Sequence, residues 1–208
     1  MGSMEGLEVY ELDKGTFRSM RHDPTDPFSL PQGSIRALLF DSAGRMWISA
    51  WGNGVSYRDP QTGRFHHFRH RPDDPSSLSG NVALCIFEDS KQRIWVGTSA
   101  GLNLLNPETG KCLWFTERDG LPNNTIYGIQ EDERGRLWFS TNYGLAQFDP
   151  MSGIVQSYTA REGIQDNEFN MGASHLGRSG RMYFGGIGGF TAFYPDSIRH
   201  NPYSPEVV

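Results

Sequence analysis

The densest group of side chains that could bind a metal ion is formed by His66, His67 and His70. On an extended strand His66 and His67 point to opposite faces, so they cannot both meet one ion without distortion. His70 lies an odd number of positions from His67, and no Cys or further His stands nearby in the sequence. We therefore interpret these histidines as an outer-strand surface patch, and we predict no metal site and no cofactor.

Acidic residues form a second set of candidates, and three of them recur at the hairpins expected between the first two strands of successive units: Asp41, Asp89 and Asp132. A carboxylate at such a turn accepts backbone N–H bonds and fixes the turn. A calcium or catalytic role would need several acids that converge on one point, which this spacing provides only at a central axis. We interpret all three as turn formers, together with the acids of the Pro-rich connections, Asp23, Asp26, Asp73 and Asp74.

Two patterns resemble catalytic or phosphate-binding motifs only in part. Residues 185–189 read Gly-Gly-Ile-Gly-Gly, but neither a following helix nor a Lys-Ser/Thr pair accompanies them, so we predict a tight turn between strands. Ser174 and His175 are neighbours on an expected strand and therefore face apart, and no Gly-x-Ser-x-Gly elbow surrounds them. The sequence therefore predicts no catalytic residue and no enzyme activity for this chain.

A repeat positions these residues. Its aromatic landmarks are 48, 43 and 45 residues apart and stand in similar segments: Trp47, Trp95, Trp138 and Tyr183. In the second copy, residues 82–98 read Val-Ala-Leu-Cys-Ile-Phe-Glu-Asp-Ser-Lys-Gln-Arg-Ile-Trp-Val-Gly-Thr. Several aligned landmarks in four copies make chance an inadequate explanation, and a period of this length is typical of propellers and other arrays.

Each unit divides into four short strands. In the second copy we expect strands near 82–88, 93–97, 102–105 and 112–116, joined by tight turns. Four antiparallel strands in a unit of this length have the size of one β-propeller blade, and blades stack because none buries both faces alone. A large ring at the second-strand position suits the wedge between blades, so the four aromatic landmarks are the predicted structural anchors.

The predicted fold is all-β: a β-propeller fragment of four-stranded antiparallel blades, with about three full blades and two partial ones. The predicted boundaries are a cloning remnant at 1–6, the end of a preceding blade at 7–20, blades at 21–70, 71–117 and 118–160, a final incomplete blade at 161–200 and the start of the next domain at 201–208. With a partial blade at each end, either one chain closes as a four-bladed ring or two chains share strands. We favour the second arrangement and predict a homo-oligomer, since open sheet edges invite association.

Composition agrees with this fold and excludes several functions. Of 208 residues 25 are Gly and 12 are Pro, while 12% are aromatic and 21% are charged, which favours short strands and tight turns. A net charge of -5 without a dense Lys/Arg stripe argues against nucleic-acid binding. No apolar run approaches the roughly 20 residues that cross a bilayer, so we predict no membrane contact by this chain. Cys85 and Cys112 are predicted to be free, buried thiols.

The repeat resembles the two-component regulator propeller repeat, which occurs in the periplasmic sensor regions of hybrid histidine kinases. The resemblance is carried by Arg-His-Asp-Pro-Thr-Asp-Pro-Phe-Ser-Leu at 21–30, by its counterpart at 69–78, and by Asp-x-x-Gly-x-x-Trp at 41–47 and 132–138. The last copy resembles the final blade of such a sensor, and 201–208 resembles the start of the triple-tyrosine immunoglobulin-like domain that follows it in this family. Two departures stand out: Gln92 replaces the Gly of the pattern, and the last copy lacks both the acid and the Trp.

The resemblance implies a sensing function. A propeller of this family responds to a ligand, often a saccharide, and the signal crosses the membrane to a cytoplasmic kinase. We therefore expect a non-catalytic, extracytoplasmic sensor fragment, periplasmic in the parent protein, whose partners are an unknown small molecule and either missing blades or a second copy of the chain.

The expected ligand site lies where the longest loops gather. In a four-stranded meander the inter-blade loops, here 70–81 and 117–125, emerge on the same face as the turns between strands two and three. Four residues of these turns place aromatic rings beside amides, which suits a saccharide such as an oligosaccharide: Trp51, Asn53, Asn142 and Tyr143. The alternative, that the two rings simply cover neighbouring loops, stays open.

Two other functions also stay open. A propeller-type lyase with metal-assisted catalysis, such as the streptogramin lyases, needs a His and an acid that converge at the ring centre, and His175 is the evident candidate. A protein-interaction propeller would instead bind a polypeptide on the loop-bearing face.

Overall fold

The computed structural model describes residues 6–198, and in that range the chain is all-β apart from three short 3-10 helices. Strands β1 (Leu7–Glu11) and β2 (Thr16–Met20) form a separate two-stranded sheet, here called the N-terminal hairpin. Nearly all of the predicted cloning remnant and the predicted start of a next domain at 201–208 lie outside the described residues.

Three four-stranded sheets and one three-stranded sheet follow the hairpin in chain order. Blade 1 holds β3 (Ile35–Phe40), β4 (Met46–Ala50), β5 (Val55–Arg58) and β6 (Phe65–Phe68), and blade 2 holds β7 (Ala83–Glu88), β8 (Ile94–Thr98), β9 (Gly101–Leu105) and β10 (Cys112–Phe115). Blade 3 holds β11 (Ile126–Glu131), β12 (Leu137–Thr141), β13 (Gly144–Phe148) and β14 (Val155–Tyr158), and blade 4 holds β15 (Phe169–Leu176), β16 (Met182–Gly186) and β17 (Gly189–Phe193). The 3-10 helices are η1 (Glu117–Asp119), η2 (Ala160–Glu162) and η3 (Pro195–Ser197).

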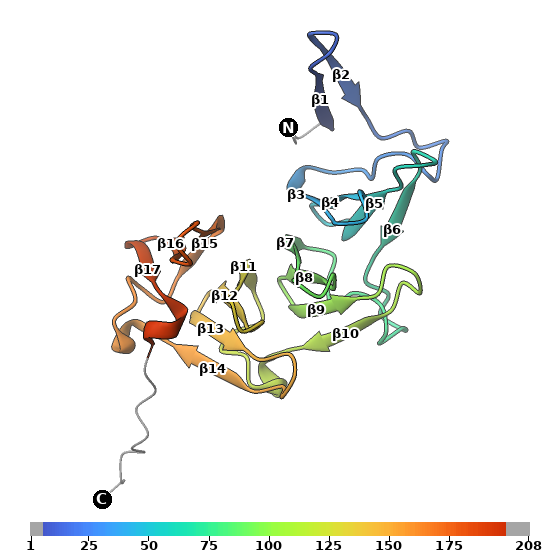
Figure 1. Ribbon diagram of the computed structural model, residues 1–208. Coiled ribbons are helices and arrows are strands. Elements are labelled where there is room, and N and C mark those ends of the chain that lie inside the picture. The colour runs from blue at the N-terminus through green and yellow to red at the C-terminus, as the bar shows by residue number, and fades with distance from the viewer. Residues whose placement is uncertain (1–5, 199–208) are drawn as a thin grey trace, which may run out of the picture.

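Every blade is an antiparallel meander whose first strand is innermost. β3 contacts β7, β7 contacts β11 and β11 contacts β15, while β6, β10 and β14 form the outer rim (Figure 1). The predicted fold class is therefore confirmed, with three full blades, one three-stranded blade and the N-terminal hairpin. The sheets lie inside the predicted units, whose boundaries stay predictions.

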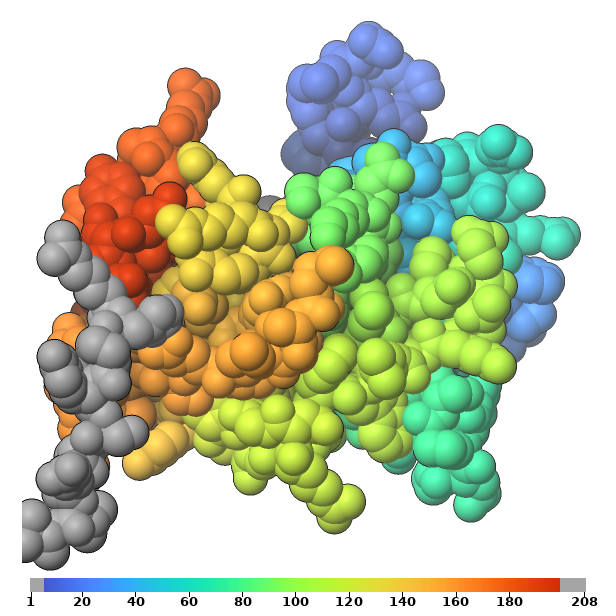
Figure 2. All heavy atoms as spheres, turned by 60° about the horizontal axis from the view of Figure 1, so that its bottom comes forward, coloured from blue at the N-terminus to red at the C-terminus, as the bar shows by residue number. Residues whose placement is uncertain are grey.

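The blades form an open arc. Within residues 6–198 the N-terminal hairpin pairs only with itself, and β17 has a strand neighbour on one side alone. Leu7, Val9 and Met20 pack the hairpin onto blade 1, so it lies at the opposite end of the arc from blade 4 (Figure 1, Figure 2). The described chain therefore does not form the four-bladed ring that the sequence left open as one of two closures.

The buried carboxylate of Asp41 organises the hairpin between the first two strands of blade 1. Its Oδ1 accepts the backbone N–H of Ala43 at 3.0 Å and that of Arg45 at 2.8 Å, which confirms its role as a turn former. Its Oδ2 accepts Nε–H of Arg45 at 2.6 Å and the indole Nε1–H of Trp47 at 2.7 Å. One carboxylate thus fixes the turn and satisfies the buried indole donor.

The same arrangement recurs in blades 2 and 3. Oδ2 of Asp89 accepts Nε–H of Arg93 at 2.6 Å and Nε1–H of Trp95 at 2.8 Å. The two corresponding bonds to Asp132, from the equivalent Arg and Trp, measure 2.7 and 2.9 Å. An acid, an Arg four residues later and a Trp six residues later therefore form one structural unit, here called the acid–Arg–Trp hairpin.

Each indole fills the seam between its own blade and the next. Trp47 packs with Ile94 and Leu105 of blade 2. Trp95 makes an edge contact with Phe148 of blade 3, with 5.9 Å between ring centroids. All three Trp rings of these hairpins are at most 1% exposed. Each ring is therefore buried between two blades, as expected of a large side chain that fills the wedge between them.

Gln92 shows why its position is usually Gly. It adopts a φ of +61°, and the glycines at the same position of the other hairpins have φ of +77°, +76° and +79°: Gly44, Gly135 and Gly180. A left-handed conformation costs a non-Gly residue roughly 1–2 kcal/mol. The hairpin nevertheless keeps its shape, because the backbone N–H of Gln92 donates to the carbonyl oxygen of Asp89 at 2.8 Å.

Polar bonds across the seams add to the apolar contacts. The backbone N–H and the hydroxyl of Ser42 donate to the carboxylate of Glu88 in blade 2 at 2.8 and 2.7 Å. Ser90 makes the same two bonds to Glu131 of blade 3, at 2.7 and 2.8 Å. Adjacent blades are therefore held in register at the end of the innermost strand as well as by the Trp ring.

Blade 4 departs from the other blades at this hairpin. Gly177 replaces the acid, and the buried Nε of Arg181 has no hydrogen-bond partner among the residues described. Tyr183 replaces the Trp and is only half-buried, since the described chain places no blade beyond it. The departure seen in the sequence thus changes the chemistry of the last hairpin while the strands persist.

We expect Trp95→Ala to lower the free energy of unfolding by about 3–5 kcal/mol, because it empties a seam that two blades line. Tyr183→Ala, at the same position of blade 4, should cost only about 1 kcal/mol, since its ring is half-buried. Urea unfolding followed by circular dichroism measures both values. Equal losses in the two variants would show that the ring does not act through the seam.

Acid should destabilise the protein through the buried carboxylates. Burial alone would raise the pKa of Asp41 and of Asp89, but hydrogen bonds from the Trp and Arg of each hairpin outweigh it and hold both pKa values below the usual 3.8. Stability from such a group is complete above the unfolded pKa and is lost as pH falls through the folded pKa. The free energy of unfolding should therefore be flat from pH 7 to about 5 and fall below about 4. Asp89→Asn should be less stable at pH 7 with a shallower acid limb, and parallel curves would contradict this origin.

Candidate functional site: the loop face

The loop face is the end of the arc where the turns between second and third strands meet the inter-blade loops. Because each blade is an antiparallel meander, the second strand ends there in every blade, and the fourth strand ends there in blades 1 to 3. The N–H of Gly54 donates to the carbonyl oxygen of Asn81 at 2.9 Å, and the N–H of Gly144 donates to that of Asn167 at 2.7 Å. Turns of one blade are thus bonded to the loop that enters the next.

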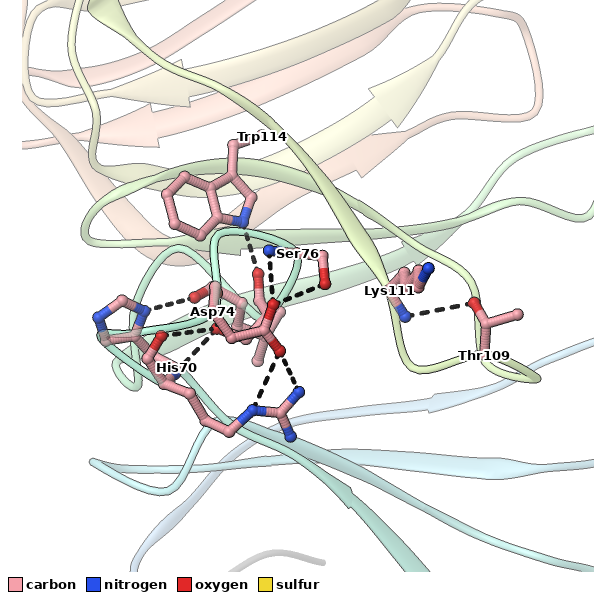
Figure 3. Close-up of polar contacts among 9 residues, drawn as sticks. His70, Asp74, Ser76, Thr109, Lys111 and Trp114 are labelled. Atoms are coloured by element: carbon pink, nitrogen blue, oxygen red, sulfur yellow. Dashed lines mark hydrogen bonds and ion pairs between the residues drawn. The ribbon is translucent and has the colours of Figure 1, made fainter.

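The loops that enter blades 1 and 2, at 21–34 and 69–82, are fixed by their own side chains. In the second loop, Nδ1 of His70 lies 2.7 Å from the carbonyl oxygen of Leu78 (Figure 3). Asp74 accepts the hydroxyl of Ser76 at 2.7 Å and its backbone N–H at 2.9 Å. Hydrogen bonds from the hydroxyl of Ser76 and, as the second cause, from the guanidinium of Arg71 lower the pKa of Asp74 to about 2.

The first of these loops repeats the same bonds. Nδ1 of His22 lies 2.8 Å from the carbonyl oxygen of Leu30, and Asp26 accepts the backbone N–H of Phe28 at 2.9 Å. Asp23 accepts the backbone N–H of Thr25 at 2.8 Å. The turn-forming role predicted for Asp23, Asp26 and Asp74 is therefore confirmed.

The loops that enter blades 3 and 4 use a different device, a short 3-10 helix with a reciprocal cap. Thr116 and Asp119 cap η1 in this way, and Thr159 and Glu162 cap η2. The side-chain oxygen of Asn124 then accepts the first backbone N–H of η1 at 2.8 Å, which closes the loop on itself. All four loops of the face are therefore held by internal polar bonds.

Two of the predicted ligand residues lie in the β4–β5 turn of blade 1. The ring of Trp51 is 48% exposed, and the guanidinium carbon of Arg36 lies 5.0 Å from its centroid. Nδ2 of Asn53 donates to the carbonyl oxygen of Gln32 at 2.9 Å. Among residues 6–198 the side-chain oxygen of Asn53 has no partner, so it remains an acceptor on the surface.

The other two lie in the β12–β13 turn of blade 3. The ring of Tyr143 is 54% exposed, and the side-chain oxygen of Asn142 accepts the hydroxyl of Tyr127 at 2.7 Å. The amide nitrogen of Asn142 keeps its donors free within the described part. Each ring therefore stands beside an amide of its own turn, but no described contact joins the blade 1 pair to the blade 3 pair.

Sequence reasoning missed Arg36 and Tyr127, which support these turns. Each lies at a β-bulge of the innermost strand, where the register with the second strand shifts, at 35–37 in β3 and at 126–128 in β11. A bulge re-aims a side chain relative to regular alternation. The only signal in the sequence was a polar or hydroxylated residue near the start of an otherwise apolar strand.

The three histidines of the sequence cluster have separate partners. His66 stacks on Tyr57 with 4.7 Å between ring centroids. The ring nitrogens of His67 lie 2.9 Å from the hydroxyl of Ser56 and 3.1 Å from the carbonyl oxygen of Pro27, and burial lowers the pKa of His67. Both lie on the outer strand β6, as predicted. Within residues 6–198 no group of three or more His, Cys, Asp or Glu is placed to hold a metal ion.

A cavity of about 550 Å³ separates the loop into blade 1 from the end of β6. Its lining is rich in charged and imidazole side chains: His22, Asp23, Asp26, His67, Arg69, His70 and Arg71. Asp23, Asp26, His22 and His70 bond within their own loops, and His67 bonds to Ser56 and to Pro27. These acids and imidazoles therefore serve the structure of the loops.

The serine–histidine pair lies on the innermost strand β15. The hydroxyl of Ser174 accepts Nε2–H of Gln130 at 3.1 Å. The ring of His175 is exposed and lies 6.4 Å from that of Tyr183, between centroids. Residues 185–189 span the β16–β17 turn, as predicted.

The two cysteines are free, as predicted. Burial raises the pKa of Cys85 and the pKa of Cys112 to about 12. The thiolate, which is the reactive form, is therefore scarce at neutral pH. Neither side chain contributes chemistry to the loop face.

A family model described as the two-component regulator propeller matches residues 29–52, 77–100 and 120–143. Each match runs from the end of an inter-blade loop, through the innermost strand and the acid–Arg–Trp hairpin, to the turn on the loop face. The chain thus carries three copies of the two-component regulator propeller repeat. The matched segments are those of blades 1 to 3, which keep the acid and the Trp.

Several solved structures share this fold. The extracellular domain assigned to a hybrid two-component system of B. thetaiotaomicron is 28% identical, with a TM-score of 0.79 over 93% of this chain and 26% of that one. PorZ, a surface component of the type-IX secretion system of Porphyromonas gingivalis, shares the fold at 15% identity and a TM-score of 0.68, over 92% of this chain and 30% of that one. A catalytically inactive virginiamycin B lyase from Staphylococcus aureus also shares the fold, at 19% identity and a TM-score of 0.52, over 76% of this chain and 55% of that one.

The chain spans about a quarter of the length of this B. thetaiotaomicron relative, at 26%. No curated protein matches it. Among the residues that the structure describes, no helix has the length and apolarity needed to cross a membrane.

Two glycines test how tightly the loop face is built. Gly144, in the β12–β13 turn, has a φ of +90°, and a Cβ there would collide with the carbonyl oxygen of Tyr158. Gly163, in the loop into blade 4, has a φ of +91° and open space around it. We expect Gly163→Ala to cost about 1–2 kcal/mol for the left-handed backbone alone. Gly144→Ala should cost clearly more in the same thermal unfolding experiment, and equal costs would mean that the turn yields.

Proposed function

We propose that this propeller is part of the extracellular sensor region of a hybrid two-component system, and that it binds a ligand without catalysing a reaction. The observation that carries the proposal is the similarity to such an extracellular domain, at 28% identity and a TM-score of 0.79 over 93% of the chain. The location, periplasmic in the parent protein, and the cytoplasmic kinase that reads the signal are parts of this proposal, because the chain spans only 26% of that relative.

Binding is favoured over catalysis by the way the reactive groups are used. The carboxylates of Asp41, Asp89 and Asp132 each accept four hydrogen bonds within their hairpins, which leaves no free lone pair for a metal ion or a proton transfer. The two thiols are protonated at neutral pH. A general base needs an unprotonated group with an available lone pair within reach of the substrate. The three carboxylates have no available lone pair, and the two thiols are protonated.

The loop face is the surface that best suits a ligand. Trp51 and Tyr143 expose about half of their rings, and the adjacent amides offer an acceptor at Asn53 and donors at Asn142. Rings that stack on the apolar face of a sugar, beside amides that bond its hydroxyls, form a saccharide-type surface. We therefore propose a neutral oligosaccharide as the ligand class, bound by the turns of blades 1 and 3.

The construction of this face also suggests how binding is transmitted. A ligand that touches two blades has different contacts when the blades shift, so it selects one arrangement of the arc. Because the turn of blade 1 bonds to the loop that enters blade 2, a shift at Trp51 reaches the neighbouring seam through backbone rather than through side chains. Ligand binding would thus change the geometry presented to the following domain.

Thermal-shift measurements with a panel of neutral oligosaccharides test the proposal. A sugar present at about 100 times its Kd should raise Tm by roughly 5 °C or more. Trp51→Ala and Tyr143→Ala should each weaken binding by about tenfold, the loss of one stacking contact. Leu113→Ala, which removes an equally exposed apolar side chain from the outer strand β10, should leave the shift unchanged. A flat Tm across the panel would contradict saccharide binding by this chain.

A further inference from the structure

The β4–β5 turn of blade 1 contains the one Asn-Gly pair of the sequence, Asn53 followed by Gly54. Asn53 is half-buried and Gly54 is buried. An Asn that precedes Gly readily loses its side-chain amide, because no side chain hinders the next backbone nitrogen and because Gly adopts the required conformations freely. The turn therefore holds a chemically reactive pair on the loop face, two residues after Trp51.

Packing fixes the glycine of this pair. Gly54 has a φ of +70°, and a Cβ there would collide with the carbonyl oxygen of Phe68. Gly144, at the same place in blade 3, is restricted in the same way by Tyr158, but the residue before it is Tyr143. The fold thus requires Gly at this place in both turns, and of the two turns the one in blade 1 has Asn before it.

Deamidation of such a pair needs only water and a base. Hydroxide removes the proton from the backbone nitrogen of Gly54, and this nitrogen attacks Cγ of Asn53. The bond between Cγ and Nδ2 breaks, and Nδ2 leaves as ammonia with a proton taken from water. Water then opens the five-membered succinimide ring at either of its carbonyls, which gives an aspartate or an isoaspartate at position 53. No electrons are transferred, so the reaction requires neither an oxidant nor a reductant.

Both reacting groups are bonded elsewhere in the structure. The backbone N–H of Gly54 donates to the carbonyl oxygen of Asn81 at 2.9 Å. Nδ2 of Asn53 donates to the carbonyl oxygen of Gln32 at 2.9 Å, and the backbone N–H of Asn53 donates to that of Ala50 at 2.8 Å. Asn81 belongs to the loop that enters blade 2, so this loop holds the nitrogen that would attack. Attack on Cγ requires that this bond is first broken.

We propose that Asn53 is a site of spontaneous deamidation, and that the bond from Gly54 to the loop into blade 2 keeps it unreactive while the loop face is closed. The reaction then proceeds only in the fraction of molecules in which the turn has separated from that loop. An opening that costs about 1.4 kcal/mol slows the reaction tenfold relative to a free chain. Deamidation at Asn53 thus records how often the loop face opens between blades 1 and 2.

The product does not restore the closed turn. A carboxylate replaces the amide that donates to the carbonyl oxygen of Gln32, so two acceptors face each other where the structure has a bond of 2.9 Å. Isoaspartate also adds a methylene to the backbone directly before Gly54, whose surroundings leave no space for a Cβ. The modified turn therefore loses its bond to the loop at 21–34, and the change is not reversed when the seam closes again.

Peptide mass spectrometry of the wild-type chain tests the proposal. After incubation at mildly alkaline pH, Asn53 should be deamidated at least about tenfold more slowly in the folded chain than in the chain unfolded in urea. Asn142, which precedes Tyr143 in the corresponding turn of blade 3, is the internal control and should react slowly in both states. Equal rates at Asn53 in the two states, or an Asn53 that stays intact in urea, would overturn the proposal.

A pair of matched variants tests the role of the loop. Asn81→Ala removes the Oδ1 that accepts the backbone N–H of His70 at 2.8 Å, and so loosens the loop into blade 2. It should speed deamidation at Asn53 in the folded chain by about fivefold, the effect of one lost hydrogen bond on the opening. Asn124→Ala removes a bond of the same length, from the backbone N–H of Glu117 in the loop into blade 3, and should leave this rate unchanged.

Two results with these variants contradict the proposal. An equal gain in both would show that the reaction follows general unfolding, and no gain in either would show that the loop into blade 2 does not control it. Circular dichroism verifies that both variants are folded during the incubation. Because no ligand is added, these outcomes are independent of whether the loop face binds a saccharide.

Discussion

A carboxylate buried beneath a Trp ring is the interaction on which this structure depends. The ring must lie in the seam, because no blade covers both of its faces alone, and its indole N–H is then removed from water. An unpaired buried donor costs about 1–3 kcal/mol, and an unpaired buried carboxylate costs more. In blade 1, Asp41 and Trp47 satisfy one another, and Arg45 balances the charge. The three residues are thus interdependent, and their spacing in the sequence is the spacing at which one hairpin brings them to a single oxygen.

The fold could be predicted from the sequence because its strongest signals are periodic. The Trp spacing, the turn residues and the apolar first strands gave the blades, their strand order and the turn role of the acids. The shared oxygen in the acid–Arg–Trp hairpin could not be read in the same way, because it depends on how the hairpin folds back on itself. From the turn position of Asp41, the sequence predicted only that its carboxylate accepts backbone N–H bonds.

The candidate site was predicted less completely, for two physical reasons. The bulges in β3 and β11 insert one residue into regular alternation, so a period-two reading misplaces Arg36 and Tyr127. Convergence of turns from different blades depends on the curvature of the arc, which is set by packing in several seams at once. The turns that carry Trp51 and Tyr143 could therefore be placed on one face, but their separation could not.

The two ends of the blades have different constraints. At the hairpin end, the same residues recur because each must satisfy its neighbour's buried groups. At the loop face, the turns differ from blade to blade, with Trp51 and Asn53 in one, Ser99 and Ala100 in the next and Asn142 and Tyr143 in the third. Variation on a rigid, internally bonded support is the usual construction of a binding surface. The loss of Trp and acid together in blade 4 follows the same logic: Tyr183 has no indole N–H, so an acid at position 177 would have no ring donor to satisfy. Arg181 is what remains of the unit, and among residues 6–198 its buried Nε has no hydrogen-bond partner.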